Sequence, residues 1–182
     1  MRLIDGFGIN DANYPVNSTV DGVKVRCKIF ERWVSMVQRC YNEKSLSRRP
    51  HYRGCSIDVR WSSFMEFRKW MLMQDWEGKQ LDKDLLVKGN KVYGPDTCCF
   101  INQKLNTSIT DTRVKSNGLP IGIHIDRGKY RVEVQSKYVG YFDDLDSALT
   151  CYTNTKRDAI RELLKLESDN RVIEAVKERF KL

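Results

Sequence analysis

One segment near the end of the chain alternates strictly between apolar and polar residues, and it constrains the fold more than any other feature. The apolar positions are Tyr130, Val132 and Val134, and the polar positions are Arg131, Glu133 and Gln135. A period of two residues is that of a β-strand with one buried face. We therefore expect the apolar set to meet a core and the polar set to lie on an open sheet face.

Segments on both sides of this strand complete a three-stranded pattern. Residues 121–125 precede it and residues 138–142 follow it, each across a short turn, as in an antiparallel sheet. A helix expected from Ala148 would cover one face, so His124 and Tyr138 would join the polar set on the other. Side chains of these types can contact base edges in the major groove. The alternative is a plain solvent-exposed sheet face.

Several short motifs in this region match one DNA-binding family. They are Gly122-Ile123, Gly128-Lys129-Tyr130-Arg131-Val132, Val139-Gly140-Tyr141-Phe142-Asp143, and Ala148 followed by Tyr152. Over residues 119–161 the chain resembles the APETALA-type, or ethylene-response-factor, domain, although its first strand lacks the family's pair of arginines. The resemblance implies a sheet that lies in the major groove. It implies DNA-contacting side chains at five positions, which are His124, Arg131, Glu133, Gln135 and Tyr138.

Basic residues are concentrated in the N-terminal half of the chain. The whole chain has 32 Lys and Arg against 24 Asp and Glu, a formal net charge of +8. Residues 23–70 alone carry 12 basic and 4 acidic side chains, and this excess equals the net charge of the chain. The densest cluster surrounds Pro50 and consists of Arg48, Arg49, His51 and Arg53. Such clustering predicts contact with nucleic-acid phosphates, and a solvated surface is the alternative.

Two amphipathic helices are predicted in the same half. The first carries apolar residues at spacings of three and four, namely Ile29, Trp33, Met36, Val37 and Cys40. Arg39 falls off this stripe, so we expect it to face water or phosphate and to contribute to DNA binding. Ser63 and Glu66 have the spacing of a capping box, which predicts a second helix whose aromatic face packs on the first.

A second set of motifs occupies the middle of the chain. It comprises Asp82-Lys83-Asp84, Asn90, Tyr93-Gly94-Pro95-Asp96-Thr97-Cys98 and Gln103-x-x-Asn106, with Arg39-Cys40-Tyr41-Asn42 and Trp61-x-x-Phe64 upstream. Residues 81–87 have a strand-like pattern. Over residues 30–106 the set resembles phage-type proteins related to HNH endonucleases, whose members often carry an APETALA-type domain next. The resemblance implies a ββα element and a divalent cation, Mg²⁺ or Mn²⁺, held by Asp82 and Asn106.

Lys83 occupies the position where nucleases of this type have their general-base histidine. The resemblance therefore makes Asp82, Lys83 and Asn106 the candidate catalytic residues. A protonated lysine cannot accept a proton, and neighbouring carboxylates favour the protonated form. Three interpretations follow: a weak nuclease, a nuclease that uses hydroxide from bulk solvent, or a catalytically degenerate DNA binder. In a purely structural interpretation, the acidic and basic residues form ordinary charge pairs on a strand surface.

The six cysteines do not form a metal-binding motif. No Cys-x-x-Cys pair is present, so buried free thiols are expected rather than structural zinc. The sequence has neither a basic-then-apolar leader pattern nor an apolar run of roughly 20 residues. We therefore expect neither secretion nor membrane insertion, and we expect the protein in the cytoplasm of a bacterial host.

Together these features predict an α+β protein with four parts. Residues 1–22 form an extended segment, residues 23–110 an HNH-like domain, residues 111–118 a linker, and residues 119–182 an APETALA-like domain with a three-stranded antiparallel sheet, a packed helix and a C-terminal helix. The predicted partner is double-stranded DNA, and the protein is predicted to be of phage or mobile-element type. If the protein is a metal-dependent HNH-like (homing-type) endonuclease, it also cleaves the DNA. The alternatives are a non-catalytic, sequence-specific regulator or inhibitor and an RNA-binding accessory protein.

Overall fold

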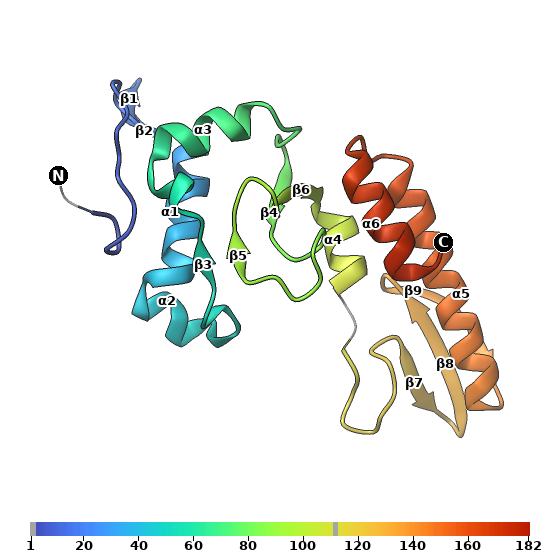
Figure 1. Ribbon diagram of the computed structural model, residues 1–182. Helices are drawn as coiled ribbons and strands as arrows, with labels where there is room; N and C mark the ends of the chain where they lie inside the picture. Colours follow the sequence, from blue (N-terminus) through green and yellow to red (C-terminus); the bar gives the residue numbers. More distant parts are fainter. Residues whose placement is uncertain (1–2, 111–112) are drawn as a thin grey trace. The chain divides into compact units, whose positions relative to one another are not determined.

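The chain folds into helices and several small β-sheets, which confirms the predicted α+β class (Figure 1). The computed structural model describes residues 3–110 and 113–182. Two compact units are formed. One comprises the residues up to 77 together with residues 81–100, and the other comprises residues 78–80 and 101–182. Within the described ranges, no helix combines the length and the apolar character needed to cross a membrane.

The first unit is built from short elements. In chain order they are β1 (Asn17–Val20), β2 (Val23–Arg26), α1 (Lys28–Tyr41), α2 (Glu43–Arg48), the 3-10 turn η1 (Pro50–Tyr52), β3 (Ser56–Ile57), the 3-10 turn η2 (Val59–Ser62) and α3 (Phe64–Leu72). β1 and β2 form an antiparallel hairpin, and β5 (Val92–Tyr93) pairs in parallel with β3. β4 (Lys79–Asp82) and β6 (Cys99–Asn102) form a further two-stranded sheet, and α4 (Gln103–Thr110) follows β6 directly.

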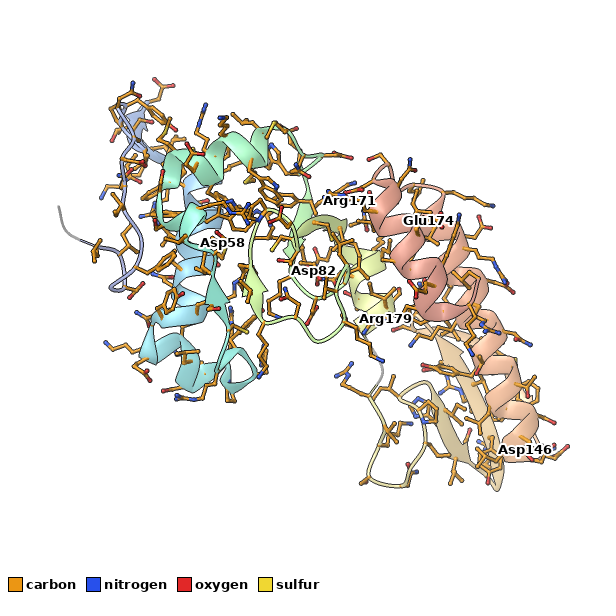
Figure 2. The ribbon with its side chains drawn as sticks, viewed as in Figure 1. Asp58, Asp82, Asp146, Arg171, Glu174 and Arg179 are labelled. Carbon is orange, nitrogen blue, oxygen red and sulfur yellow. The ribbon has the colours of Figure 1, made fainter. Side chains whose placement is uncertain are left out.

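β4 is shorter than the strand predicted over residues 81–87. Oδ1 of Asp82 accepts hydrogen bonds from the backbone N–H groups of Asp84 (3.0 Å) and Leu85 (2.8 Å), which turn the chain out of the extended conformation (Figure 2). Asn90 holds the loop that follows, because its amide donates to the carbonyl oxygens of Lys83 and Val92. Local bonds from side chain to backbone compete with strand pairing. The prediction of a continuous strand here was therefore wrong.

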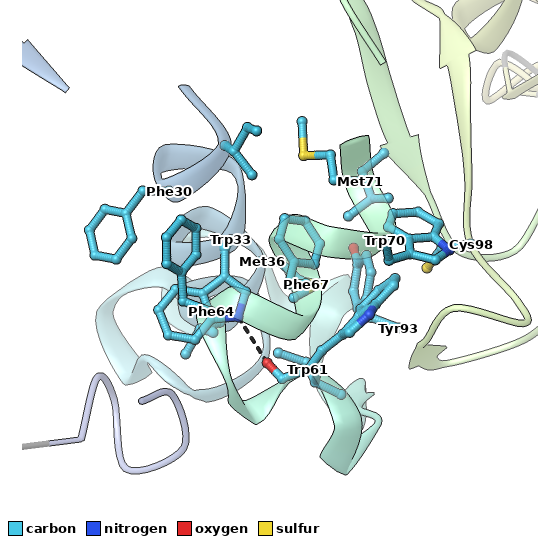
Figure 3. Close-up of a cluster of buried hydrophobic side chains, with 14 of the residues drawn as sticks. Phe30, Trp33, Met36, Trp61, Phe64, Phe67, Trp70, Met71, Tyr93 and Cys98 are labelled. Carbon is cyan, nitrogen blue, oxygen red and sulfur yellow. Dashed lines mark hydrogen bonds between the residues drawn. The ribbon is translucent and has the colours of Figure 1, made fainter. Parts of the chain in front are cut away.

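The core of the first unit is the aromatic interface between α1 and α3 (Figure 3). The apolar stripe predicted for α1 is buried. At the start of α3, Oγ of Ser63 accepts the backbone N–H of Glu66 at 3.1 Å, as the capping pattern predicts. Nε1 of Trp33 donates to the carbonyl oxygen of Trp61 at 2.8 Å, so the buried indole nitrogen has a partner.

The N-terminal segment, which was predicted only to be extended, packs on this core. The N–H of Ile9 donates to the carbonyl oxygen of Ser62, and the carbonyl oxygen of Ile9 accepts from Phe64. Gly8 lies against the indole of Trp33, where an added Cβ would come within 2.7 Å of a ring carbon. The segment therefore helps to hold the start of α3 against α1.

The second unit contains a three-stranded antiparallel sheet. β7 (Ile123–Asp126), β8 (Lys129–Val134) and β9 (Lys137–Phe142) neighbour one another in that order. α5 (Leu145–Leu164) covers one face of the sheet, and α6 (Asn170–Phe180) follows it (Figure 1). Ile123, Val132 and Ala148 are fully buried between sheet and helix. α5 begins three residues before the predicted start, because the Asp144 carboxylate accepts the N–H of Ser147 at 2.8 Å and caps the helix.

Gly122 allows the chain to enter β7 close to both β8 and α5. A Cβ at this position would lie 2.2 Å from the carbonyl oxygen of Glu133 and 2.6 Å from the ring of Tyr152. The carbonyl oxygen of Gly122 accepts the N–H of Glu133 at 2.7 Å. Only glycine leaves room for this approach, which fixes the edge of the sheet under the aromatic ring.

The division between the two units precedes the predicted linker. α4 belongs to the second unit, where it contacts α5. Residues 111 and 112 of the predicted linker lie outside the described residues. The start of β4 also belongs to the second unit, and the ammonium group of Lys79 forms a buried ion pair with Glu167 in the segment between α5 and α6. Oε1 of Glu167 also accepts the N–H of Ser168 at 3.0 Å.

Candidate nucleic-acid interface

The face of the β7–β9 sheet opposite α5 carries a connected set of polar and aromatic side chains. The strand register pairs His124 with Arg131 and Arg131 with Tyr141, and it pairs Glu133 with Tyr138. The apolar residues of β8 lie on the other face, toward α5. The alternation in the sequence therefore correctly predicted which face Arg131 and Glu133 occupy.

The carboxylate of Glu133 contacts both Arg131 and His124 on this face. Oε1 forms an ion pair with the guanidinium of Arg131, and Oε2 lies 3.7 Å from Nε2 of His124. The guanidinium carbon of Arg131 also lies 5.8 Å from the centroid of the Tyr138 ring. Two contacts from different strands thus hold Arg131 in one orientation, which lowers the entropy it would lose on binding a base.

Two tyrosines form the exposed aromatic part of this face. The rings of Tyr138 and Tyr141 lie 5.8 Å apart, with 57% and 46% of each residue exposed. The hydroxyl of Tyr141 donates to Oδ2 of Asp126 at 2.5 Å, and this hydrogen bond raises the pKa of Tyr141. The sequence interpretation used Tyr141 only as part of a family motif. Its position opposite Arg131 in the hairpin register was the signal that could have identified it.

Lys115 supports the edge of the interface. Its Nζ lies 2.5 Å from the carbonyl oxygen of Ile123 and 3.1 Å from Nδ1 of His124. Because an ammonium group only donates, Nδ1 is the accepting nitrogen and Nε2, which faces Glu133, carries the hydrogen. Sequence reasoning treated Lys115 as part of a linker, and no local pattern connects it to His124.

Gln135 does not lie on the open face, and its predicted place there was wrong. β8 ends at Val134, and Gln135 and Ser136 both have positive φ angles (51° and 62°), as in a two-residue hairpin turn. The amide of Gln135 donates to Oγ of Ser108 in α4 at 2.9 Å. The turn starts one residue earlier than the pattern indicated, so this side chain contacts a neighbouring helix.

The basic cluster of the first unit is exposed, as predicted. Arg48 ends α2, Arg49 precedes η1, and His51 and Arg53 lie in and after it. Arg53 lies 3.7 Å from Glu43, and the ring of His51 lies 4.4 Å from that of Tyr52. Among the described residues, none forms a hydrogen bond or ion pair with the side chains of Arg48 and Arg49. Their guanidinium groups are therefore available to phosphate oxygens.

Arg39 does not project freely into solvent, which corrects the prediction for this residue. Its guanidinium carbon lies 5.6 Å from the ring centroid of Tyr52 and 5.2 Å from that of Tyr93, and its Nε donates to the carbonyl oxygen of Ser35 at 3.2 Å. Both aromatic partners are distant in the sequence, so helical periodicity could not reveal them. Arg39 thus contributes to packing between α1 and the loops beside it.

Asp82, at the end of β4, is a turn-forming carboxylate with limited solvent contact. Burial and the charge of Asp84 raise the pKa of Asp82, and its backbone hydrogen bonds oppose this effect. For Lys83, burial alone would lower the pKa, but the carboxylate of Asp84, at 3.1 Å, outweighs it and the pKa of Lys83 is raised. Lys83 is therefore an ammonium group at neutral pH and cannot serve as a general base.

Asn106, on α4, has one satisfied and one orphaned amide atom. Its Nδ2 donates to Oε1 of Gln80 at 3.0 Å, whereas its Oδ1 is buried with no hydrogen-bond partner among the described residues. Asp82 belongs to the first unit and Asn106 to the second. Carboxylate and amide oxygens suit Mg²⁺ or Mn²⁺, but the described residues contain no cluster of three or more His, Cys, Asp or Glu able to hold a metal. The donor types fit a hard cation, but the set is smaller than a resident metal centre needs.

The cysteines considered as zinc ligands are buried and form no disulfide among the described residues. They are Cys40, Cys55, Cys98 and Cys99. Burial raises the pKa of Cys40 and Cys98 to about 12 in each case. Both thiols are therefore protonated at neutral pH and unreactive as nucleophiles.

No protein-family model matches the chain, and neither the curated proteins nor the solved structures gave a match.

Proposed function

We propose that this protein binds double-stranded DNA and recognises base sequence with the open face of the β7–β9 sheet. In this proposal it is a protein of phage or mobile-element type that acts in the cytoplasm of a bacterial host. One observation carries the proposal. Glu133 orients both Arg131 and His124 on a sheet face that α5 leaves uncovered, next to the exposed Tyr138 and Tyr141. A sheet face that only contacts water does not need the guanidinium of Arg131 to be held by a carboxylate.

The chemistry of this face fits major-groove recognition. β-strands enter the major groove in several classes of DNA-binding protein. A guanidinium group held by its neighbours can donate two hydrogen bonds to O6 and N7 of guanine, which contributes about 1–3 kcal/mol of discrimination. Glu133 then acts as a positioning residue for Arg131. Tyr138 and Tyr141 offer apolar ring surface together with hydroxyl groups.

The basic cluster around Pro50 has a different part in the proposal. Arg48, Arg49, His51 and Arg53 are exposed and lie on short, tightly turned segments. Contacts of arginine with phosphate add affinity and fix orientation without discriminating between sequences. We therefore assign affinity mainly to the first unit and base preference to the second.

A binding titration tests this proposal. Labelled 25-base-pair duplex DNA and an A-form RNA duplex of the same sequence are titrated at several salt concentrations. We expect duplex DNA to bind more tightly than RNA, and we expect affinity to fall steeply as salt rises because counterions are released. Binding that is insensitive to salt, or equal for RNA and DNA, would contradict the proposal.

Metal-dependent cleavage is the second candidate function, and Asn106 favours it. Its buried amide oxygen, which has no partner among the described residues and lies on a helix that follows a two-stranded sheet, is of the type that binds a hard cation. Lys83 offers no base, so the hydroxide would have to come from bulk solvent. If no cleavage occurs, the protein acts by binding alone, as a regulator or inhibitor.

A nicking assay separates these two functions. Supercoiled plasmid is incubated with the protein and Mg²⁺ or Mn²⁺, with and without EDTA, and the Asp82→Asn and Asn106→Ala variants are run beside the wild type. A nuclease that depends on these two residues nicks only with metal and loses activity in both variants. Nicking that persists in both variants would exclude them as catalytic residues, and binding without nicking would support the non-catalytic role.

A further inference from the structure

Two adjoining grooves occupy the second unit, away from the middle of the sheet face. The first has a volume of about 400 Å³ and lies among the end of α4, the β7–β8 region and α5. The second has a volume of about 380 Å³ and lies between α5 and the C-terminal end of α6. Tyr152 and Lys156 line both grooves, so the two adjoin along α5.

The second groove is strongly cationic. Seven residues line it, of which four are Lys or Arg and none is Asp or Glu, the cations being Lys156, Arg157, Arg179 and Lys181. The first groove adds Arg113, and among the described residues Glu133 is the only carboxylate that lines it. Such an excess of one charge in a concave surface attracts anions from solution.

Cations elsewhere on the same helices are arranged differently. Lys165 pairs with Glu162 on α5, and Lys177 pairs with Glu174 on α6, each at a spacing of three residues. In contrast, no described residue forms a hydrogen bond or ion pair with the side chain of Arg179 or Lys181, which both line the second groove. Among the described residues, Arg179 and Lys181 therefore lack the carboxylate partners that Lys165 and Lys177 have.

The wall of the second groove is held in place by a helix cap. Nε of Arg157 donates to the carbonyl oxygen of Phe180 at 3.0 Å, which satisfies a terminal carbonyl of α6. Lys181 adopts a left-handed conformation, with φ of 51°, and its backbone N–H donates a hydrogen bond to the carbonyl oxygen of Glu178. The end of α6 is thereby fixed against α5, so the backbone positions that carry Arg179 and Lys181 stay beside Arg157.

We propose that these grooves bind the phosphate backbone of DNA next to the segment that contacts the open sheet face. This inference rests on the proposed function. His124 and Glu133 belong both to the open face and to the lining of the first groove, so one strand can pass from the face along α5 without leaving protein contact. The regular negative charge of a nucleic-acid backbone matches a row of cations that spans both grooves.

The test compares two double variants with the same change of charge. Arg179→Gln with Lys181→Gln alters the second groove, and Lys165→Gln with Lys177→Gln alters paired cations outside it on the same helices. Binding to a 25-base-pair duplex is measured from 0.05 to 0.3 M salt, and circular dichroism confirms that both variants fold. We expect the groove variant to lose about 10- to 60-fold in affinity at 0.1 M salt, and its slope against log salt to fall by about 1 to 2. The control should change less than threefold.

The possible results separate this inference from the proposed function. If the wild-type protein does not bind DNA, the proposed function fails and this inference fails with it. If the wild type binds and the groove variant matches the control, only the groove is excluded. If the groove variant binds with unchanged affinity but altered base preference, the grooves do not contact phosphates. A uniform loss over all sequences, with base preference preserved, supports the proposal.

Discussion

Replacing Glu133 with glutamine should increase affinity for DNA and decrease selectivity. The change removes the charge that orients Arg131 and His124 but keeps the shape of the side chain. It also removes a negative charge that opposes phosphate. At a separation near 4 Å in water this repulsion is about 1 kcal/mol, so affinity for random duplex DNA should rise roughly fivefold. A tight binder with poor discrimination is the expected phenotype.

The loss of selectivity follows from the freedom that Arg131 gains. A well-held bidentate contact discriminates by about 1–3 kcal/mol, or roughly 5- to 150-fold. In Glu133→Gln the guanidinium exchanges its ion pair for a weaker contact with a neutral amide oxygen and keeps the Tyr138 ring, and we expect discrimination at its base position to fall below about 1 kcal/mol. The ion pair itself is partly exposed, with 36% of the Arg131 side chain and 24% of the Glu133 side chain accessible. Its removal should therefore cost only about 0.2–1 kcal/mol of stability.

Fluorescence anisotropy on matched and mismatched duplexes measures both effects. Glu162→Gln is the control, because it removes one exposed carboxylate from α5, away from the sheet face. If Glu133→Gln weakens binding to every sequence equally and leaves preference intact, Glu133 does not position Arg131, and the reasoning is refuted.

Three further perturbations test the fold around the site. Burial and Asp84 raise the pKa of Asp82, so the folded state holds this proton more tightly than the unfolded state, and the free energy of unfolding falls as pH rises above about 4. Asp82→Asn should remove this pH-dependent loss of stability and be more stable than the wild type at pH 7 in urea unfolding. Equal pH profiles for the two proteins would contradict this prediction. Glu167→Gln breaks the buried ion pair with Lys79 and should destabilise the second unit by about 3–5 kcal/mol in the same assay, whereas a loss below about 1 kcal/mol would mean that the pair is not desolvated. Gly122→Ala forces a Cβ to within 2.2 Å of the carbonyl oxygen of Glu133. The overpacking should lower the free energy of unfolding of the second unit by about 1–3 kcal/mol, and with it the melting temperature of that unit, without changing the melting temperature of the first unit.

The sequence predicted those features that depend on local periodicity. The alternation around Val132 was enough to place Arg131 and Glu133 opposite α5, because the side-chain direction in a strand follows from position alone. The apolar spacing in α1 predicted the buried face of that helix, and the capping pattern at Ser63 predicted the start of α3, because both depend on local sequence alone.

Features that depend on long-range contacts or on a shift of one residue were not predictable. Arg39 packs against Tyr52 and Tyr93, which come from distant segments. Gln135 lies in a turn that begins one residue earlier than expected, and a single-residue difference is enough to move a side chain off the sheet face. Lys115 reaches His124 from outside the strands, where no pattern marks it.

Sequence recognition by the sheet face and phosphate contact by the basic cluster predict different results in a binding selection from a random duplex pool. The selection is run on the wild type, on Arg131→Ala and on Arg49→Ala. We expect the wild type to enrich a motif, Arg131→Ala to lose preference at one or two positions of that motif, and Arg49→Ala to enrich the same motif with weaker binding throughout. An unchanged motif with Arg131→Ala, together with an altered motif with Arg49→Ala, would contradict the account.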